Sequence, residues 1–246
     1  MEAVVKFTNQ SQGRDRVFRT TQYACSLLIY LLRNKSEGRD LVAKLQQLET
    51  NMRAGRKLFR LGNAVNSIVA AKQTVHLPDR VLRLCLTVAN FSRALYFLCD
   101  NVVWARGVGL VRNIDKERWS VNASRFYFYS LVMHLTRDAY VIFLLMVKKS
   151  RDEQFKHKLN QHVNESCDVA EAVIPELDTF VFLLLETLKS HPAVALDTVK
   201  NICDLFIPLD RLGFYKTNAG VVGFCGLMSS LMGIVTLAHP ALRIKP

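Results

Sequence analysis

Residues 217–242 read TNAGVVGFCGLMSSLMGIVTLAHPAL and contain no Asp, Glu, Lys or Arg. This uncharged run exceeds the roughly 20 residues that an α-helix needs to cross a hydrocarbon core of about 30 Å. Basic residues flank the run on both sides, and they are Arg211, Lys216, Arg243 and Lys245. We therefore expect a transmembrane helix over 219–239, followed by a short tail over 240–246; the alternative is a buried core helix.

Small residues recur along one side of this expected helix. They follow one another at spacings of four, three, four and three residues, and they are Ala219, Gly223, Gly226, Ser230 and Gly233. In lipid, a stripe of small residues allows two helix backbones to approach closely, which favours helix association. The stripe therefore predicts self-association of the chain or packing against another span.

Residues 84–105 also have the length of a membrane span, but they contain Arg93 and Asp100. On insertion scales, their nine Leu, Val and Phe residues favour the membrane by about 3–5 kcal/mol, while two central charges oppose it by about 5–7 kcal/mol. The two charges are seven residues apart, so they share a helix face that could point into a bundle. The segment either crosses the bilayer with the support of partner helices or lies in its interface.

A basic amphipathic pattern occupies about 53–76, within a stretch from 50 to 78 that has no acidic residue. The apolar residues at helical spacing are Leu58, Leu61, Val65, Ile68 and Val75, and the basic residues are Arg53, Arg56, Lys57, Arg60 and Lys72. An apolar face opposite a purely positive polar face is typical of a helix that lies in a membrane interface. Inserted into one leaflet, such a helix would expand it and favour positive curvature. The alternative is a core helix with a solvated basic face.

Helical periodicity dominates the whole chain, because no long stretch alternates apolar with polar residues. We expect an all-α fold: a helical integral membrane protein with an interfacial amphipathic helix and one or two transmembrane helices. The expected helices cover about 14–32, 40–76, 79–105, 118–149, 176–190 and 193–207, with breaks at Pro192 and Pro208. The polar segment 148–171 is expected to be an exposed loop or a partly helical linker.

The net charge of +12 implies an anionic partner, either nucleic acid or a membrane with acidic lipids, and the uncharged run argues against nucleic acid. The sequence has no P-loop, Rossmann fingerprint, G-x-S-x-G or H-E-x-x-H motif. His157, His162 and Cys167 lie in the polar linker without zinc-type spacing, and Asp197, Asp204 and Asp210 are expected on exposed helix faces. We expect no catalytic residue, no metal and no cofactor, so the chain is not expected to be an enzyme.

Several stretches resemble the peroxisomal biogenesis factor 11 family, and among its alpha and beta branch most closely the alpha type. They are FTNQSQGRDR at 7–16, TQYAC at 21–25, GRKLFRLGN at 55–63, RALYFLCDNVVW at 93–104 and DTVKNICDLFIPLDRLGFY at 197–215, followed by the glycine-rich span. The resemblance covers nearly the whole chain except 148–171.

The resemblance implies a multi-pass protein of the peroxisomal membrane with both termini in the cytosol. It implies a cytosolic helical region over 1–83, spans near 84–105 and 219–239, and a helical region over 106–218. The helix around 55–75 would remodel the membrane, so that peroxisomes protrude, elongate and proliferate before fission. The alternative function is a metabolite pore, for which the polar groups within the apolar helices are Arg93, Asp100, Arg137 and Asp138.

The resemblance also implies partners. They are anionic lipids of the peroxisomal membrane, further copies of the chain, family paralogues in hetero-oligomers, a tail-anchored fission adaptor and a dynamin-related GTPase. The alpha type is linked to coatomer through a dilysine tail. The tail here is Arg243-Ile244-Lys245-Pro246, with an arginine in place of one lysine, so coatomer binding does not carry over.

Overall fold

The computed structural model describes residues 11–33, 39–163, 176–239, 242 and 244, and its regular elements are all helices. The all-α prediction is therefore confirmed. The helices are α2 (Ser11–Leu32), α3 (Arg39–Phe59), α4 (Asn63–Thr74), α5 (Arg80–Gly107), α6 (Lys116–Val163), α7 (Glu176–Ser190), α8 (Pro192–Leu212) and α9 (Ala219–Ala238).

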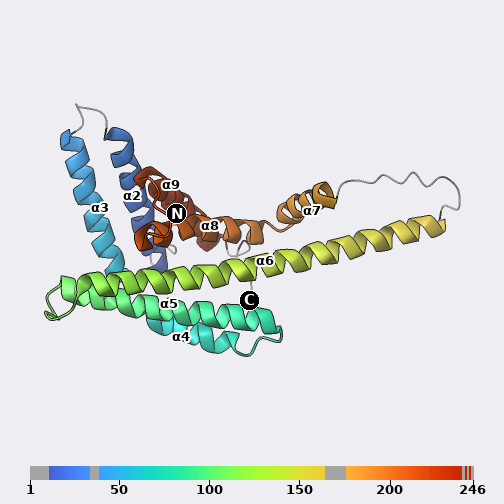
Figure 1. The fold of residues 1–246 in the computed structure, drawn as a ribbon, viewed down its shortest axis with the longest axis horizontal. Helices are drawn as coiled ribbons and strands as arrows, with labels where there is room; N and C mark the ends of the chain where they lie inside the picture. Colours follow the sequence, from blue (N-terminus) through green and yellow to red (C-terminus); the bar gives the residue numbers. More distant parts are fainter. Residues whose placement is uncertain (1–10, 34–38, 164–175, 240–241, 243, 245–246) are drawn as a thin grey trace.

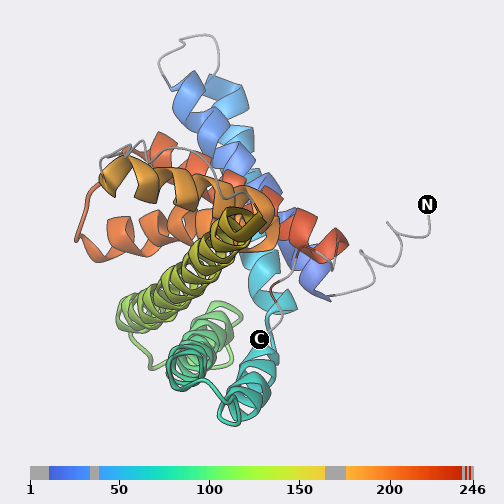
Figure 2. The same ribbon diagram turned by 90° about the vertical axis from the view of Figure 1, so that its right-hand side faces the viewer.

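Two groups of helices cross one another. In the first group α5 and α6 lie side by side as an antiparallel hairpin, with α4 packed along α5 (Figure 1). In the second group α2 packs between α3 and α9, and α8 joins the groups because it contacts both α6 and α9. Figure 2 shows α6 almost end-on while α9 runs across the view, so the two groups are steeply inclined to each other.

The sequence expectation of one helix over 40–76 is wrong, because α3 and α4 are separated by a turn. Gly62 has a φ of 83°, a left-handed conformation that glycine adopts without the steric cost other residues meet. After α4, the carboxylate of Asp79 begins the next helix by accepting hydrogen bonds from the backbone N–H groups of Val81 and Leu82, at 2.8 and 3.0 Å. Local turn chemistry thus folds α4 back along α5.

Two further boundaries differ from expectation. Helix α8 continues through the fully buried Pro208 to Leu212, because the packing of α8 against α6 and α9 outweighs the lost backbone hydrogen bond. Helix α6 extends to Val163, so the first part of the expected linker 148–171 is helical. Residues 164–171 lie outside the described part of the chain.

Three helices are long and apolar enough to cross a membrane: Arg80–Gly107, Lys116–Asp152 and Ala219–Ala238. The first and third coincide in position with the spans expected at 84–105 and 219–239, and that these helices cross the membrane stays a prediction. For the segment in α6 the sequence predicts only a helix, over about 118–149.

Candidate membrane-contact site

The aliphatic residues of the amphipathic segment all lie on the surface. Their exposed fractions are 51% for Leu58, 39% for Leu61, 62% for Val65, 52% for Ile68 and 47% for Val75, and Val69, half exposed, joins them. We refer to these six residues as the aliphatic stripe. An exposed row of branched aliphatic side chains is rare on a soluble monomer and is typical of a surface that meets lipid or another apolar partner.

The opposite side of α4 is small and polar, and it faces the protein. Ala64, Ser67 and Thr74 are buried where α4 packs along α5. The hydroxyl oxygens of Thr74 and Thr87 lie 3.1 Å apart across this contact. The arrangement is therefore the reverse of a soluble amphipathic helix, which turns its aliphatic side to the core.

Two of the five predicted cations are exposed. Arg53 forms an ion pair with Glu49 one turn earlier on α3, at 2.6 Å. Lys72 follows Val65, Ile68 and Val69 at spacings of seven, four and three, so it shares the face of the aliphatic stripe instead of lying opposite to it. A lysine at the end of an apolar face can extend its ammonium group to the lipid headgroups.

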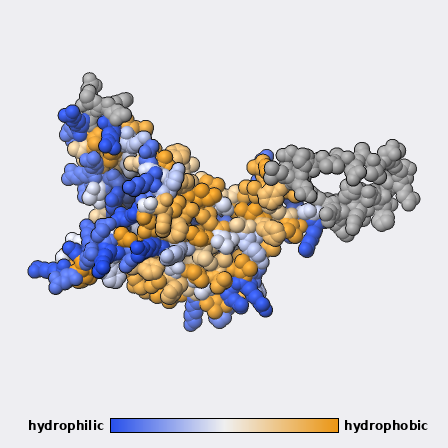
Figure 3. All heavy atoms as spheres, viewed as in Figure 1, coloured by the Kyte–Doolittle hydropathy of each residue, from blue (hydrophilic) through white to orange (hydrophobic). Residues whose placement is uncertain are grey.

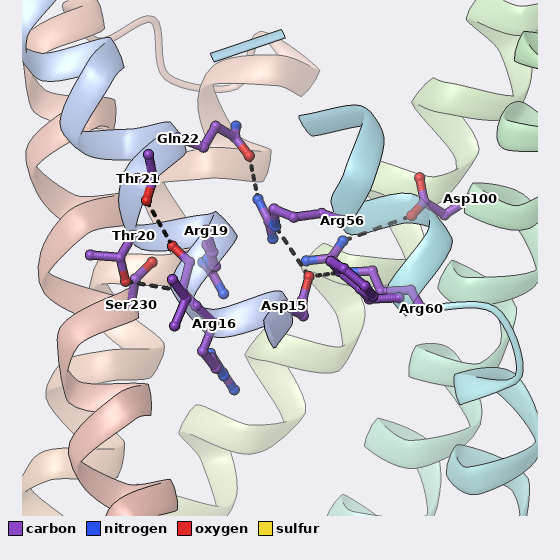
Figure 4. A network of polar contacts seen from close by, with 12 residues as sticks. Asp15, Arg16, Arg19, Thr20, Thr21, Gln22, Arg56, Arg60, Asp100 and Ser230 are labelled. Carbon is purple, nitrogen blue, oxygen red and sulfur yellow. Dashed lines mark hydrogen bonds and ion pairs between the residues drawn. The ribbon is translucent and has the colours of Figure 1, made fainter. Parts of the chain in front are cut away.

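The other three cations point into the protein. The guanidinium of Arg56 lies 3.2 Å from the carboxylate of Asp15 on α2 and donates to the amide oxygen of Gln22 at 2.5 Å (Figure 4). The guanidinium of Arg60 lies 3.0 Å from the same Asp15 carboxylate and donates to the hydroxyl of Tyr96 at 2.6 Å. Arg56 is only 7% exposed, so its charge is not presented to a membrane in this conformation.

A second carboxylate completes this network. Asp100 on α5 lies 3.5 Å from the ammonium of Lys57 and 3.8 Å from the guanidinium of Arg60. Asp15 and Asp100 thus share the charges of Arg56, Lys57 and Arg60. We call these five residues the ion-pair network, and it joins the end of α3 to α2 and α5.

Asp15 and Arg56 of the network remain ionised at neutral pH. Burial alone would raise the pKa of Asp15, but the charges of Arg60 and Arg56 outweigh it and hold that pKa below its ordinary value. Burial and the neighbouring Arg60 lower the pKa of Arg56 to about 10, against the opposing effect of Asp15. Both groups therefore carry full charge at physiological pH.

The sequence did not reveal the role of Asp15, Gln22 or Tyr96. Asp15 is the only acidic residue between 3 and 36, inside the basic run Arg14 to Arg19. A lone carboxylate in a basic, largely apolar stretch is a signal that could have been used, because a buried acid needs a cationic partner. Which cation it meets depends on how α2 packs on α3, and sequence spacing does not give this.

The small-residue stripe of α9 packs against α2 within the same chain. Gly223 faces the backbone of Leu27, Gly226 faces the ring of Tyr23, and Gly233 faces the guanidinium of Arg16. The hydroxyl of Ser230 donates to the carbonyl oxygen of Gly226 at 2.5 Å, and Ala219 at the helix start is exposed. The stripe is thus occupied by a helix that is not itself a candidate span.

Charges within the apolar helices also find partners in the chain. The guanidinium of Arg137 lies 2.8 Å from the carboxylate of Asp138 and 2.5 Å from that of Asp197 on α8. Asp204, also on α8, is buried, pairs with Arg19 and accepts a hydrogen bond from Ser229 at 2.5 Å. The expectation that Asp197 and Asp204 lie on exposed helix faces is therefore wrong.

Nothing in the described residues suggests a metal centre, since no group of three His, Cys, Asp or Glu side chains there is placed to hold an ion. The side chains of His157, His162 and Cys167 lie outside the part of the chain whose side chains are described. It stays a prediction that the aliphatic stripe and the five basic residues of the amphipathic segment contact lipid.

Comparison with known proteins agrees with this membrane architecture. The family described as Peroxisomal biogenesis factor 11 matches residues 1–238. Peroxisomal membrane protein 11A of Homo sapiens is 48% identical over 245 residues, which cover 100% of this chain and 99% of the relative. Peroxisomal membrane protein 11B of Homo sapiens is 44% identical over 259 residues, which cover 100% of both.

A more distant relative, the Peroxisomal membrane protein 11 homolog of Dictyostelium discoideum, is 25% identical over 240 residues, which cover 95% of this chain and 92% of the relative. No solved structure matches the chain. The higher identity to the 11A relatives supports the alpha type. The chain belongs to the peroxisomal biogenesis factor 11 family, and it is a peroxisomal membrane protein with a role in peroxisome biogenesis.

Proposed function

We propose that this protein bends and elongates the peroxisomal membrane by inserting its aliphatic stripe into one leaflet, which prepares the organelle for fission. The observation that carries the proposal is the orientation of α4, which packs its small polar side on α5 and leaves Val65, Ile68 and Val69 outside. No catalytic step is part of this function. The inserted stripe bends the membrane through the volume of its side chains, because these expand the leaflet that they enter.

The magnitudes favour insertion. An aliphatic side chain that is already half buried gains about 1 kcal/mol when lipid covers the remainder, so the six residues of the stripe together contribute several kcal/mol. Lys72, which is exposed, adds about 1 kcal/mol near an anionic surface, and Arg53, which is exposed but paired with Glu49, adds less. The apolar term therefore dominates, and the two cations tune the preference for acidic lipids.

The antiparallel hairpin α5–α6 supplies the membrane anchor in this proposal. Figure 3 shows apolar side chains gathered over the middle of the molecule, with hydrophilic surface around α2, α3 and the α5–α6 turn. Crossing by α5 and α6 returns the chain to the side on which it began, so both termini can face the cytosol. Helix α9 runs across this pair in Figure 2, so in this proposal it lies within the apolar layer and, unlike the expectation from sequence for 219–239, does not cross it.

Three of the four charged groups that suggested a metabolite pore are paired within the chain, whereas Arg93 has no ion pair with the described residues. Asp100 pairs with Lys57 and Arg60, and Arg137 pairs with Asp138 and Asp197. Charges that are paired within the chain are not free to line a water-filled path. We therefore keep membrane remodelling as the proposed function.

The proposed partners follow from the family resemblance. They are anionic lipids of the peroxisomal membrane, further copies of the chain, paralogues in hetero-oligomers, and a tail-anchored fission adaptor with its dynamin-related GTPase. Oligomers would concentrate many inserted aliphatic stripes on one patch of membrane, and the GTPase would sever the resulting membrane tubule.

The proposal is tested by placing charge in the aliphatic stripe. The full chain with Val65→Glu and Ile68→Glu is reconstituted into vesicles that contain acidic lipids, and tubules are counted by electron microscopy. Buried in acyl chains, each carboxylate costs several kcal/mol, so tubule formation should be lost. Asn66→Glu with Gln73→Glu is the matched control, because it adds the same two charges to α4 at exposed polar positions. Equal tubulation by the stripe variant and the control would overturn the proposal.

A further inference from the structure

The ion-pair network holds three cations that an anionic membrane would otherwise attract. Of the five basic residues in the amphipathic segment, only Arg53 and Lys72 are exposed. Arg56, Lys57 and Arg60 instead share the two carboxylates of Asp15 and Asp100. Arg56 and Arg60 cannot contact lipid phosphate while their guanidinium groups donate to Asp15, and the ion pair with Asp100 holds the partly exposed Lys57 toward the protein.

Carboxylate and phosphate oxygens accept the same charge-assisted hydrogen bonds from guanidinium and ammonium groups. The two carboxylates and the lipid headgroups are thus competitors for one set of donors. The competition is close for two reasons. Two carboxylates balance three cations, and Asp100 lies at the long distances of 3.5 Å from Lys57 and 3.8 Å from Arg60. Two neutral groups, the Gln22 amide oxygen and the Tyr96 hydroxyl, accept further hydrogen bonds from Arg56 and Arg60, where a third carboxylate is lacking.

The end of α3 can move at the turn around Gly62 when the ion pairs of the network open. The network holds the last turn of α3 and Arg60, and the break at Gly62 follows at once. A Cβ on Gly62 would meet nothing within 4 Å, so the turn is not held by packing around this residue. Once the ion pairs open, the end of α3 can move at Gly62 while α4 stays packed on α5, and Arg56, Lys57 and Arg60 become available to lipid phosphate.

We propose that Asp15 and Asp100 determine how much anionic lipid the protein requires, by holding Arg56, Lys57 and Arg60 until lipid phosphate replaces them. The inference rests on the proposed function, since it concerns the same segment. On membranes poor in acidic lipids the segment presents its aliphatic stripe and two cations. On membranes rich in acidic lipids all five cations bind, and the segment binds more tightly.

The expected effect is large. A Lys or Arg near an anionic surface increases binding about fivefold, so the release of three cations increases it by up to about a hundredfold. Asp15→Asn and Asp100→Asn keep the shape of each side chain while they remove its charge. They should therefore lower the fraction of acidic lipid needed for half-maximal tubulation, with Asp15→Asn giving the larger decrease because it frees both arginines.

The experiment titrates phosphatidylserine in vesicles that carry the full-length protein and measures tubulation for each variant. Asp197→Asn is the matched control, because Asp197 also lies between two cations, Arg137 and Lys200, but none belongs to the amphipathic segment. This control should not lower the lipid requirement. Adding Arg56→Gln and Arg60→Gln to Asp15→Asn should abolish the gain.

The variants separate the possible outcomes. A lower requirement for Asp15→Asn or Asp100→Asn, absent in Asp197→Asn, supports the inference. An unchanged or higher requirement in a variant that keeps its helical circular dichroism overturns it. Should Asp15→Asn fail to fold, Asp100→Asn alone decides between these results, because Lys57 is partly exposed and tolerates the loss of its partner. If Val65→Glu with Ile68→Glu abolishes tubulation while the Asn variants change nothing, the inference fails and the proposed function stands.

Discussion

Gly226 of α9 lies against the aromatic ring of Tyr23 on α2, so closely that a single added Cβ would overlap the ring. One turn earlier, Gly223 faces the backbone of Leu27, with 3.1 Å between the position of a Cβ and the Leu27 nitrogen. The small residues thus serve the fold of one chain. Close backbone approach of this kind stabilises helix pairs without a hydrophobic driving force.

Gly226→Leu is therefore expected to separate α2 from α9 and to destabilise the protein by about 1–3 kcal/mol or more. The measurement is the thermal unfolding midpoint in detergent, followed by circular dichroism. Gly107→Leu is the control, because Gly107 has an ordinary φ and open space around a Cβ. If both variants melted together while Gly226→Leu alone reduced cross-linked dimer, the stripe would instead act between chains.

Acid should weaken the contact between α6 and α8. Burial alone would raise the pKa of Asp197, but Lys200 and Arg137 outweigh it and lower that pKa to about 2. An acid whose pKa is depressed on folding contributes stability above its unfolded pKa, near 4, and loses it as the pH falls through its folded pKa. The loss should be about 2 kcal/mol between pH 4 and pH 2.

The free energy of unfolding in detergent, measured across this window, checks the prediction. Asp197→Asn removes the titrating group, so its unfolding free energy should fall less steeply than that of the unmodified protein. Parallel pH profiles for the two proteins would show that Asp197 is not the group responsible.

The topology makes a prediction about the junction between α7 and α8. When α5 and α6 cross the bilayer and α9 does not, the exposed junction at Ser190 and His191 lies on the cytosolic side. An epitope inserted between these two residues should be digested when protease is added to intact peroxisomes. Protection of the epitope until the membrane is permeabilised would instead indicate that α5 and α9 are the crossing helices.

The long periodic elements could be predicted from sequence because their signals are local. The uncharged run gave α9 within one residue at its end, and the apolar run at 84–105 gave most of α5. The aliphatic residues at 58–75 were also recognisable as one set, since helical spacing alone places them together. Sequence spacing does not state whether such a set faces the core or the surroundings.

The partners of the charges could not be predicted, because they come from distant parts of the chain. Arg56 meets a carboxylate 41 residues away, and Arg137 meets one 60 residues away. Arg137 and Asp138 of α6 meet Asp197 and Asn201 of α8, which sequence spacing does not bring together. The break between α3 and α4 was missed for a related reason: periodicity continues across Gly62, and only packing of α4 on α5 selects the turn.

The side of α4 that meets lipid is the most direct test of this account. A small diazirine-bearing residue is placed at Val65, which is 62% exposed, or at Ser67, which is buried at the α5 contact, in the full chain reconstituted with alkyne-tagged lipid. After illumination, the probe at Val65 should become attached to lipid, and the probe at Ser67 should become cross-linked to peptides of α5. Lipid attachment at Ser67 without attachment at Val65 would contradict the account, because α4 would then meet the membrane with its other face.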